Sequence, residues 1–317
     1  MTVRLMETVP NFSEGRDPEV LEAVVHAMSD AGADVLDWSA DYHHHRSVVT
    51  AVGAPEVVEE AAVRAASVAA QRIDLRRHAG LHPRVGALDV LPFVPLLGLT
   101  LADAVASAHR VGRRLAGEVG LPVYYYGAAS RPAGRALAEL RRGGFETLMA
   151  RWPKGREPDE LPGDWDHPGA HPTAGAVCVG ARRVLLAWNV LLGGITLAAA
   201  RAIARTVRER GGGFQGVRAL ALALPDRGVQ VSMNLEDPDA VSPLAVFDRI
   251  VQLAEEAGGH VLETEVIGLV PDRLVADAAA DRLRLRPGTA ERLLSARLAD
   301  HLARTATGTT TRMTWNG

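Results

Sequence analysis

The chain has 317 residues, of which 47% are hydrophobic and 23% are charged, and its formal net charge is −3. This length corresponds to about two domains, and the composition is typical of folded globular proteins. A charge balance this close to zero argues against a general binder of polyanions, so no nucleic acid is expected as a partner.

Lys154 is the one lysine among 35 basic residues, and Cys178 is the one cysteine. Arginine keeps its proton at working pH, so an amine nucleophile would have to be Lys154, which stands in the loop-like segment 152–156. The sequence has no Gly-Lys-Ser/Thr ending for a phosphate-binding P-loop. A single cysteine excludes intrachain disulfides and zinc sites built from several cysteines. We interpret Cys178 as a small buried residue and not as a nucleophile.

Charged residues in segment 1–7 leave no room for the apolar stretch of a signal peptide. The longest uncharged run, between Arg183 and Arg201, contains Asn189 and a pair of glycines. A span of the bilayer needs about 20 apolar residues, so this run is better interpreted as a strand, a turn and the start of a helix. We predict a cytoplasmic protein without membrane contact.

The first half of the chain predicts two helices and four strands. Asp17 and Pro18 form a helix start, with an N-cap residue followed by proline in the first turn. Helical spacing of apolar residues and β-branched runs predict the remaining elements. In chain order these are a strand over 3–12, a helix over 17–30, strands over 33–38 and 46–53, a helix over 55–71 and a strand over 86–94.

The second half predicts the same β-α-β-β-α-β order without visible sequence identity. Its predicted elements are a strand over 184–192, a helix over 195–210, strands over 217–224 and 229–235, a helix over 241–257 and a strand over 260–267. This split β-α-β pattern gives a sheet with helices on one face. The predicted fold class is therefore α/β (α+β), with two ferredoxin-like subdomains whose sheets face each other across a ligand cleft.

Between the halves, we predict a helix over 101–116, a strand over 123–126 and a helix over 132–142. The following polar segment, 151–172, is rich in proline and glycine, so it is either a linker or a lid that binds ligand. We assign residues 1–176 to an N-terminal subdomain, with 151–176 as its connecting loop. Residues 177–317 form the C-terminal subdomain, which ends in a helix over 284–303 and a Thr-rich tail over 305–314.

His82 is the most informative of the 11 histidines. The following proline holds it in an extended conformation, in a loop bounded by Gly80 and Gly86. Such a loop presents an imidazole to a cleft, although a single loop histidine is often structural. Segment 11–15 offers an amide, a hydroxyl and a carboxylate after the first strand, either for a ligand or as a helix-capping turn.

The run from His43 to His45 raises the question of a metal site. On a strand only His43 and His45 would share a face, and two ligands do not make a site. The candidates for a third ligand are Asp41, His78, His82 and His171. A metal-dependent hydrolase that uses His43 and His45 stays an alternative, although we expect no metal.

Four segments, 9–16, 45–48, 77–90 and 171–176, resemble in order and spacing the motifs of the formiminotransferase domain family, over roughly residues 3–278. The resemblance implies two subdomains with a folate-binding cleft between them, a homodimer, and transfer of a formimidoyl group to N5 of tetrahydrofolate. Relatives are often fused to a cyclodeaminase. Residues 281–317 are too few for that domain, so a separate protein is expected to act on the product.

By the same resemblance, His82 matches the catalytic base of the family. The motif positions that match cleft residues are Asn11, Glu14, Arg46, His78 and Arg84. The segment 164–173 matches the folate-contacting segment. The further candidates for substrate or folate binding are Asp41, His44, His45, Asp164, Trp165, Asp166, His167, His171 and Thr173.

The chain departs from the family pattern in two places. It has Asp164-Trp165-Asp166-His167 where relatives resemble Asp-Phe-Gly-Pro, and His45 where they have asparagine. Both departures add imidazoles, so the donor is either N-formimidoyl-L-glutamate or a related N-formimidoyl amine. Trp165 stacks on the pterin or is a hydrophobic residue of a lid. A folate-binding protein without catalysis is the remaining alternative.

Formimidoyl transfer makes a defined chemical demand. N5 attacks the amidinium carbon, a tetrahedral adduct forms, and the donor amine leaves. One group takes the N5 proton and returns it to the departing nitrogen, and histidine suits this role because its ordinary pKa is about 6.5. Arg46 and Arg84 are expected to bind the carboxylates of donor and folate.

Overall fold

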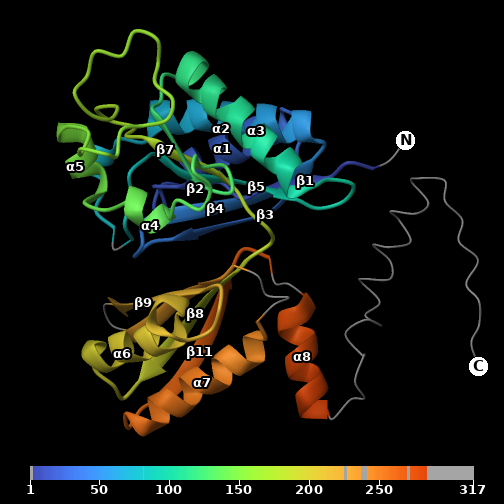
Figure 1. Ribbon diagram of the computed structural model, residues 1–317, viewed down its shortest axis with the longest axis vertical. Coiled ribbons are helices and arrows are strands. Elements are labelled where there is room, and N and C mark those ends of the chain that lie inside the picture. Colours follow the sequence, from blue (N-terminus) through green and yellow to red (C-terminus); the bar gives the residue numbers. More distant parts are fainter. Residues whose placement is uncertain (1–2, 81, 225–226, 237–240, 270–271, 284–317) are drawn as a thin grey trace, which may run out of the picture. The chain divides into compact units, whose positions relative to one another are not determined.

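The computed structural model describes residues 3–80, 82–224, 227–236, 241–269 and 272–283. The chain divides into two compact units, the first of which is Leu5–Arg183, while the second contains the described residues from Val184 onward together with residues 3–4 (Figure 1). The boundary differs from the expected one at residue 176 because residues 177–181 form a strand of the first sheet. The helix predicted over 284–303 and the tail over 305–314 lie outside the described residues.

The first unit contains, within its described residues, a seven-stranded sheet. The strands are β1 (Met6–Thr8), β2 (Asn11–Phe12), β3 (Asp34–Asp41), β4 (Arg46–Gly53), β5 (Leu88–Pro95), β6 (Val123–Gly127) and β7 (Val177–Ala181). β1 and β2 each pair antiparallel with both β4 and β5, so together they fill one position between those strands. β3 pairs with β4 at one edge, and β7 and β6 continue the sheet parallel to β5.

The first strand is interrupted where one continuous strand was predicted over 3–12. Pro10 has no N–H to donate, and its carbonyl accepts a hydrogen bond of 3.1 Å from the N–H of Val49. The two short strands therefore stay in the sheet although the ladder between them is broken.

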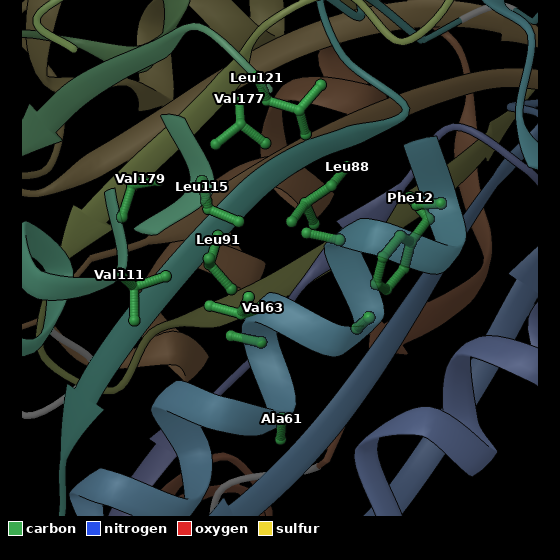
Figure 2. Close-up of a cluster of buried hydrophobic side chains, with 14 of the residues drawn as sticks. Phe12, Ala61, Val63, Leu88, Leu91, Val111, Leu115, Leu121, Val177 and Val179 are labelled. Carbon is green, nitrogen blue, oxygen red and sulfur yellow. The ribbon is translucent and has the colours of Figure 1, made fainter. Parts of the chain in front are cut away.

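Three helices build the main core on one face of this sheet: α1 (Pro18–Ser29), α2 (Pro55–Arg72) and α3 (Leu101–Arg114). The Asp17 side chain accepts a hydrogen bond from the N–H of Glu19, with Pro18 next in the chain, as predicted for this helix start. Side chains from α2, α3, β5 and β7 meet in the core shown in Figure 2. The α-helical part of α3 ends at Arg114, and a π-helical turn follows over Leu115–Val119.

A smaller cluster of buried side chains, which includes Val90, Tyr124, Tyr126 and Cys178, involves the short helices α4 (Leu137–Leu140) and α5 (Gly144–Ala150). A longer helix was predicted over 132–142. Its first turn does not form, since Gly134 has a φ of +99°, outside the helical region. The polar segment 151–172 forms no helix or strand, as expected.

The second unit has a four-stranded antiparallel sheet within its described residues, in the order β11-β8-β10-β9. Its elements are β8 (Leu186–Gly193), α6 (Leu197–Val207), β9 (Val217–Leu224), β10 (Gly228–Leu235), α7 (Pro243–Glu256), β11 (His260–Ile267) and α8 (Asp272–Leu283). α6 and α7 pack with the sheet into one core. The predicted α/β (α+β) class of two β-α-β-β-α-β units is confirmed, and the cleft between facing sheets stays a prediction. No described helix is both long and apolar enough to span a membrane.

Candidate active site

The site begins where the pairing of β2 with β5 is irregular. The register shifts between Asn11 and Phe12, which leaves Asp89 as the extra residue of a bulge in β5. A bulge redirects a side chain from the regular alternation of its strand. Asp89 is fully buried, and its Oδ1 accepts a hydrogen bond of 2.8 Å from the N–H of Val85. A carboxylate is thus fixed inside the first unit.

Two arginines share this carboxylate. Arg46, the first residue of β4, places Nη1 2.7 Å from Asp89 Oδ2, and Arg141, which follows α4, donates Nη2 to the same oxygen. Asn11 Oδ1 accepts from Arg46 Nη2 at 2.9 Å and from Nε at 3.2 Å. The exposed fractions of the Arg46 and Arg141 side chains are 11% and 13%. Because two guanidiniums face one carboxylate, this Arg46-Asp89-Arg141 cluster carries one uncompensated positive charge.

Burial and the charges within the cluster shift the pKa values of Asp89 and Arg46. Burial alone would raise the pKa of Asp89, but Arg141 and Arg46 outweigh that effect and hold it well below its usual range. Burial lowers the pKa of Arg46 to about 10, which still leaves it charged. Asp89 and Arg46 are therefore both ionised near neutral pH.

His82 is held in one tautomer next to this cluster. Its Nδ1 lies 2.8 Å from the carbonyl oxygen of Pro83, and since a carbonyl only accepts, Nδ1 carries the proton. The lone pair therefore resides on Nε2. Burial, together with the positive charges of Arg46 and Arg141, lowers the pKa of His82 to about 2. The imidazole is neutral at physiological pH, as a group that accepts a proton must be.

The run from His43 to His45 lies in the turn between β3 and β4, and not on a strand as assumed in the metal-site alternative. His43 is exposed, whereas His45 is buried, so the two do not form a ligand pair. Asp41 Oδ1 accepts from the backbone N–H of His44 at 2.7 Å, and its Oδ2 lies 2.9 Å from His44 Nδ1. This contact lowers the pKa of Asp41 to about 2. The His44 ring lies edge-on to His82, with 6.2 Å between ring centroids.

His45 connects the turn to two other segments. Its Nε2 lies 3.0 Å from Glu14 Oε1, an oxygen that also accepts from the backbone N–H groups of residues 15–17. Its ring stacks on His78, with 4.2 Å between centroids and 8° between planes. His78 Nε2 donates to the carbonyl of His45 at 2.8 Å, and burial lowers the pKa of His78 to about 4. The stacked imidazoles of His45 and His78 thus join segments 14–17, 42–45 and 78–80.

Two glycines allow these segments to approach so closely. A Cβ on Gly80 would lie 2.3 Å from the carbonyl oxygen of His44, and one on Gly15 would lie 2.5 Å from the backbone nitrogen of Arg46. Backbone atoms cannot yield as the end of a flexible side chain can. Glycine at both positions is therefore required for this packing.

Arg84 binds the loop backbone. Its Nη2 lies 3.2 Å from the carbonyl oxygen of His78 and 2.8 Å from Glu146 Oε1 on α5. These bonds hold the part of the His82 loop that leads into β5 against α5. Its Nη2 is thus engaged by protein groups, whereas its Nε is buried without a hydrogen-bond partner among the described residues.

The expected folate segment forms a second group of contacts. The Trp165 ring lies 5.2 Å from the ring of His167 and 6.4 Å from that of His171, measured between centroids. His171 Nδ1 accepts from the N–H groups of Ala174 at 3.0 Å and Thr173 at 3.3 Å, so its Nε2 carries the proton. Burial lowers the pKa of His171.

This second group joins the first through the backbone, where the carbonyl of Thr173 accepts from the N–H of Leu75 at 2.9 Å. Asp164 and Asp166 are exposed in the same loop. The structure therefore brings most of the predicted residues into one network and leaves the loop residues in a neighbouring one. The first network comprises Asn11, Glu14, Asp41, His44, His45, Arg46, His78, His82 and Arg84.

The sequence interpretation missed Asp89 and Arg141 as site residues. A signal for Asp89 existed, since it is the one charged residue in the apolar run 88–95. Arg141 offers no such signal, because it stands beside Arg142 in a polar stretch, and only the fold shows which of the two is buried.

Cys178 is fully buried, as interpreted from the sequence. Burial, with the charge of Asp89 adding to it, raises the pKa of this thiol to about 12, so it is not a thiolate at neutral pH. Within the described part of the chain, no three His, Cys, Asp or Glu side chains are grouped to hold a metal ion.

Comparison with known families decides the relationship. The formiminotransferase domain, N-terminal subdomain, matches residues 5–182, and the formiminotransferase domain matches residues 187–284. The boundary between the two matches, at residues 183–186, lies at the same place in the sequence as the boundary between the two compact units. The chain belongs to the formiminotransferase family. The resemblance inferred from four motifs is thereby confirmed.

Similar members of this family are of two kinds. The glutamate formimidoyltransferase of Streptococcus pyogenes serotype M1 is 38% identical over 279 residues, which are 87% of this chain and 92% of that protein. The glutamate formimidoyltransferase of Thermoplasma acidophilum is 35% identical over 284 residues, 89% of this chain and 93% of that protein. The formimidoyltransferase-cyclodeaminase of Sus scrofa is 41% identical over 286 residues, but the match covers only 52% of that longer protein.

Proposed function

We propose that this formiminotransferase moves a formimidoyl group from N-formimidoyl-L-glutamate, or a related N-formimidoyl amine, to N5 of tetrahydrofolate. One observation carries the proposal: His82 presents a neutral Nε2 beside a cluster with one uncompensated positive charge. A proton acceptor next to a cationic site suits a reaction between two carboxylate-bearing molecules. The glutamate formimidoyltransferases among its relatives support the same assignment.

In this proposal His82 is general base and then general acid. Nε2 takes the proton from N5 as that nitrogen attacks the amidinium carbon. After the tetrahedral adduct forms, the same Nε2–H protonates the donor nitrogen, and the carbon–nitrogen bond to the donor breaks. The hydrogen bond from Nδ1 to Pro83 keeps the ring in the required tautomer throughout.

The networks around His82 have supporting roles. Asp41 orients His44, and Glu14 orients His45, so the imidazoles at 44, 45 and 78 form a fixed wall. We assign these residues, with Asn11, to substrate positioning. We assign the loop 164–173 to the pterin and its tail, with Trp165 offering a flat apolar face.

The proposal includes the surroundings of the reaction. Tetrahydrofolate acts as co-substrate, and the chemistry asks for no metal. We further propose a homodimer in the cytoplasm, and a cyclodeaminase activity that consumes the product, since the Sus scrofa relative carries both names on one chain.

The test is a transfer assay with purified protein, tetrahydrofolate and N-formimidoyl-L-glutamate, in which formation of 5-formimidoyltetrahydrofolate is followed. A panel of other N-formimidoyl amines covers the case of a different donor. Tetrahydrofolate binding in calorimetry without turnover on any donor would favour the non-catalytic folate binder. Turnover that requires added zinc or iron, with the metal found by elemental analysis, would favour the hydrolase alternative.

A further inference from the structure

We propose that the Arg46-Asp89-Arg141 cluster is the receptor for a ligand carboxylate, and that filling this receptor makes His82 a stronger base. The inference rests on the proposed function and deepens it. It names the group that recognises the substrate and couples recognition to the proton transfer.

Charge and hydrogen bonding single out Arg141 within the cluster. Arg46 already donates to Asp89 and, through two nitrogens, to Asn11. Arg141 donates Nη2 to Asp89, and its Nε is buried without a hydrogen-bond partner among the described residues. Within the described part of the chain, Arg141 shares its one carboxylate partner with a second guanidinium, and its Nε–H has no acceptor. A buried guanidinium in this state is an incomplete binding site. A planar carboxylate is the anion whose geometry completes it.

The other arginines close to the His82 loop are already occupied. Arg84 also has a buried Nε without a hydrogen-bond partner among the described residues, but its Nη2 donates to two backbone carbonyls and to Glu146, a carboxylate that balances its charge. Arg16 donates to the carbonyls of Tyr42 and Ala79. The cluster differs from both in that two largely buried guanidiniums share one carboxylate.

The same charge acts on His82. The charged groups that act on its ring electrostatically are Arg46 from β4, Arg141 after α4 and Asp89 from β5, and the ring in contact with it is that of His44 from the β3–β4 turn. With the receptor empty, the excess positive charge opposes protonation of Nε2. A bound carboxylate cancels that charge, so the pKa of His82 rises toward its ordinary value of about 6.5, although burial, the larger cause of the low pKa, still holds it below that value. A base with a pKa near the working pH accepts protons most effectively. Binding of the carboxylate therefore makes His82 a more effective base.

Both substrates of the proposed reaction carry such a carboxylate. The donor has it on its glutamate, and tetrahydrofolate has it on its glutamate tail. The experiment separates them with L-glutamate, tetrahydrofolate and 6-methyltetrahydropterin, which keeps the reduced pterin ring but has no carboxylate. Only the ligand whose carboxylate enters the receptor shifts the titration of His82.

The test is an NMR titration of protein labelled at histidine, with the His82 signal assigned by its loss in His82→Gln. Without ligand, we expect His82 to stay neutral to the lowest pH at which the protein is folded. A saturating carboxylate ligand should raise its pKa by more than one unit. Arg141→Gln should raise the pKa without ligand and abolish the response, and it should raise KM for the carboxylate substrate about 10- to 100-fold. Arg141→Lys, which keeps the charge, should preserve the response.

Arg142→Gln is the matched control, because it removes the same charge from the exposed neighbouring residue. It should titrate and turn over like the parent. The inference is overturned if no ligand moves the His82 pKa, or if Arg142→Gln moves it as much as Arg141→Gln does. The titration needs no turnover, so transfer with an unresponsive His82 would refute this inference alone. A responsive His82 without transfer on any donor would refute the proposed function alone.

Discussion

The two units of the chain have the same strand order, yet they differ in where the pattern is broken. The split β-α-β order in the first unit is β5, the β1/β2 position, β4 and β3, and in the second it is β11, β8, β10 and β9. In the second unit β8 and β10 pair without a register shift from Leu186 to Leu192, and β11, the counterpart of β5, has a bulge at the exposed Leu262. In the first unit the strand that corresponds to β8 is interrupted at Pro10, and its neighbour β5 bulges at Asp89.

The breaks in the first unit coincide with the charged interior. The first unit buries Asp89 with Arg46 and Arg141, whereas the second buries uncharged Asn189 and Gln230. A regular ladder has no free backbone N–H with which to satisfy a buried carboxylate, while the bulge lets Val85 donate to Asp89. Among the described residues, one topology thus has an uncharged interior in one unit and holds the charged cluster of the proposed reaction site in the other.

The sharpest way to break this comparison is His82→Gln. Loss of the base should lower kcat by about 10² to 10⁴ without changing the circular dichroism spectrum or the unfolding transition. His260→Gln is the matched control, since His260 is an exposed histidine at the start of β11. Equal losses in both variants, or full activity in His82→Gln, would contradict the assignment of chemistry to the first unit.

The second comparison concerns stability. Asp89→Ala leaves two buried guanidiniums without their counter-charge and should lower the free energy of unfolding by about 3–5 kcal/mol. Asn189→Ala in the second unit removes a polar contact of 3.4 Å to Glu265 and should cost about 1 kcal/mol. Urea denaturation followed by circular dichroism gives both values. Similar costs would mean that the charged cluster contributes no more to stability than an ordinary buried amide.

The third comparison is pH dependence. The pKa values of His78 and His82, about 4 and about 2 in the folded protein, lie below the ordinary value of about 6.5. Below pH 6.5 the unfolded chain therefore binds protons that the folded chain does not, and stability is lost as the pH falls toward 4. Hydrogen–deuterium exchange should show this loss in peptides of the first unit. The described residues of the second unit include no buried histidine.

His78→Gln is the variant that tests the cause. Glutamine can still donate to the carbonyl of His45 but does not titrate, so the acid sensitivity between pH 6.5 and 4 should decrease. An unchanged pH dependence in this variant would assign the effect to other groups.

Most elements could be predicted because their patterns are local. β9 and β11 have the predicted ends, and α2 differs from its predicted end by one residue, because apolar periodicity and breakers act within each segment. The interruption at Pro10 and the strand β7 were missed. Both depend on neighbours far along the chain: Val49 bonds to Pro10, and β7 fits between β5 and β6.

The site was predictable to the same extent. Motifs located the residues around His82, including Arg46 and His78. They did not reveal that His45 lies in a turn, or that Arg141 and not Arg142 reaches Asp89. Burial and pairing of charge arise from tertiary packing, which a single sequence does not contain.

The smallest predicted effect compares the two hairpins. In both, the chain has a positive φ where it enters the returning strand, +50° at His45 before β4 and +109° at Gly228, the first residue of β10. Glycine adopts such angles freely, whereas they strain the backbone of a histidine. The contacts of His45 with Glu14 and His78 offset this strain. Asparagine tolerates this region better than most residues. His45→Asn should therefore change the unfolding free energy by less than about 1 kcal/mol.

His45→Ala loses the same contacts and also keeps the strain, so it should be less stable than His45→Asn by about 1 kcal/mol in parallel urea titrations. If alanine and asparagine are equally costly, backbone conformation is not what limits this position, and the lost stacking on His78 accounts for the whole effect. If asparagine matches the parent while alanine does not, the turn needs only a residue that accepts a positive φ. Histidine at position 45 then serves the site, and the fold of the hairpin does not depend on it.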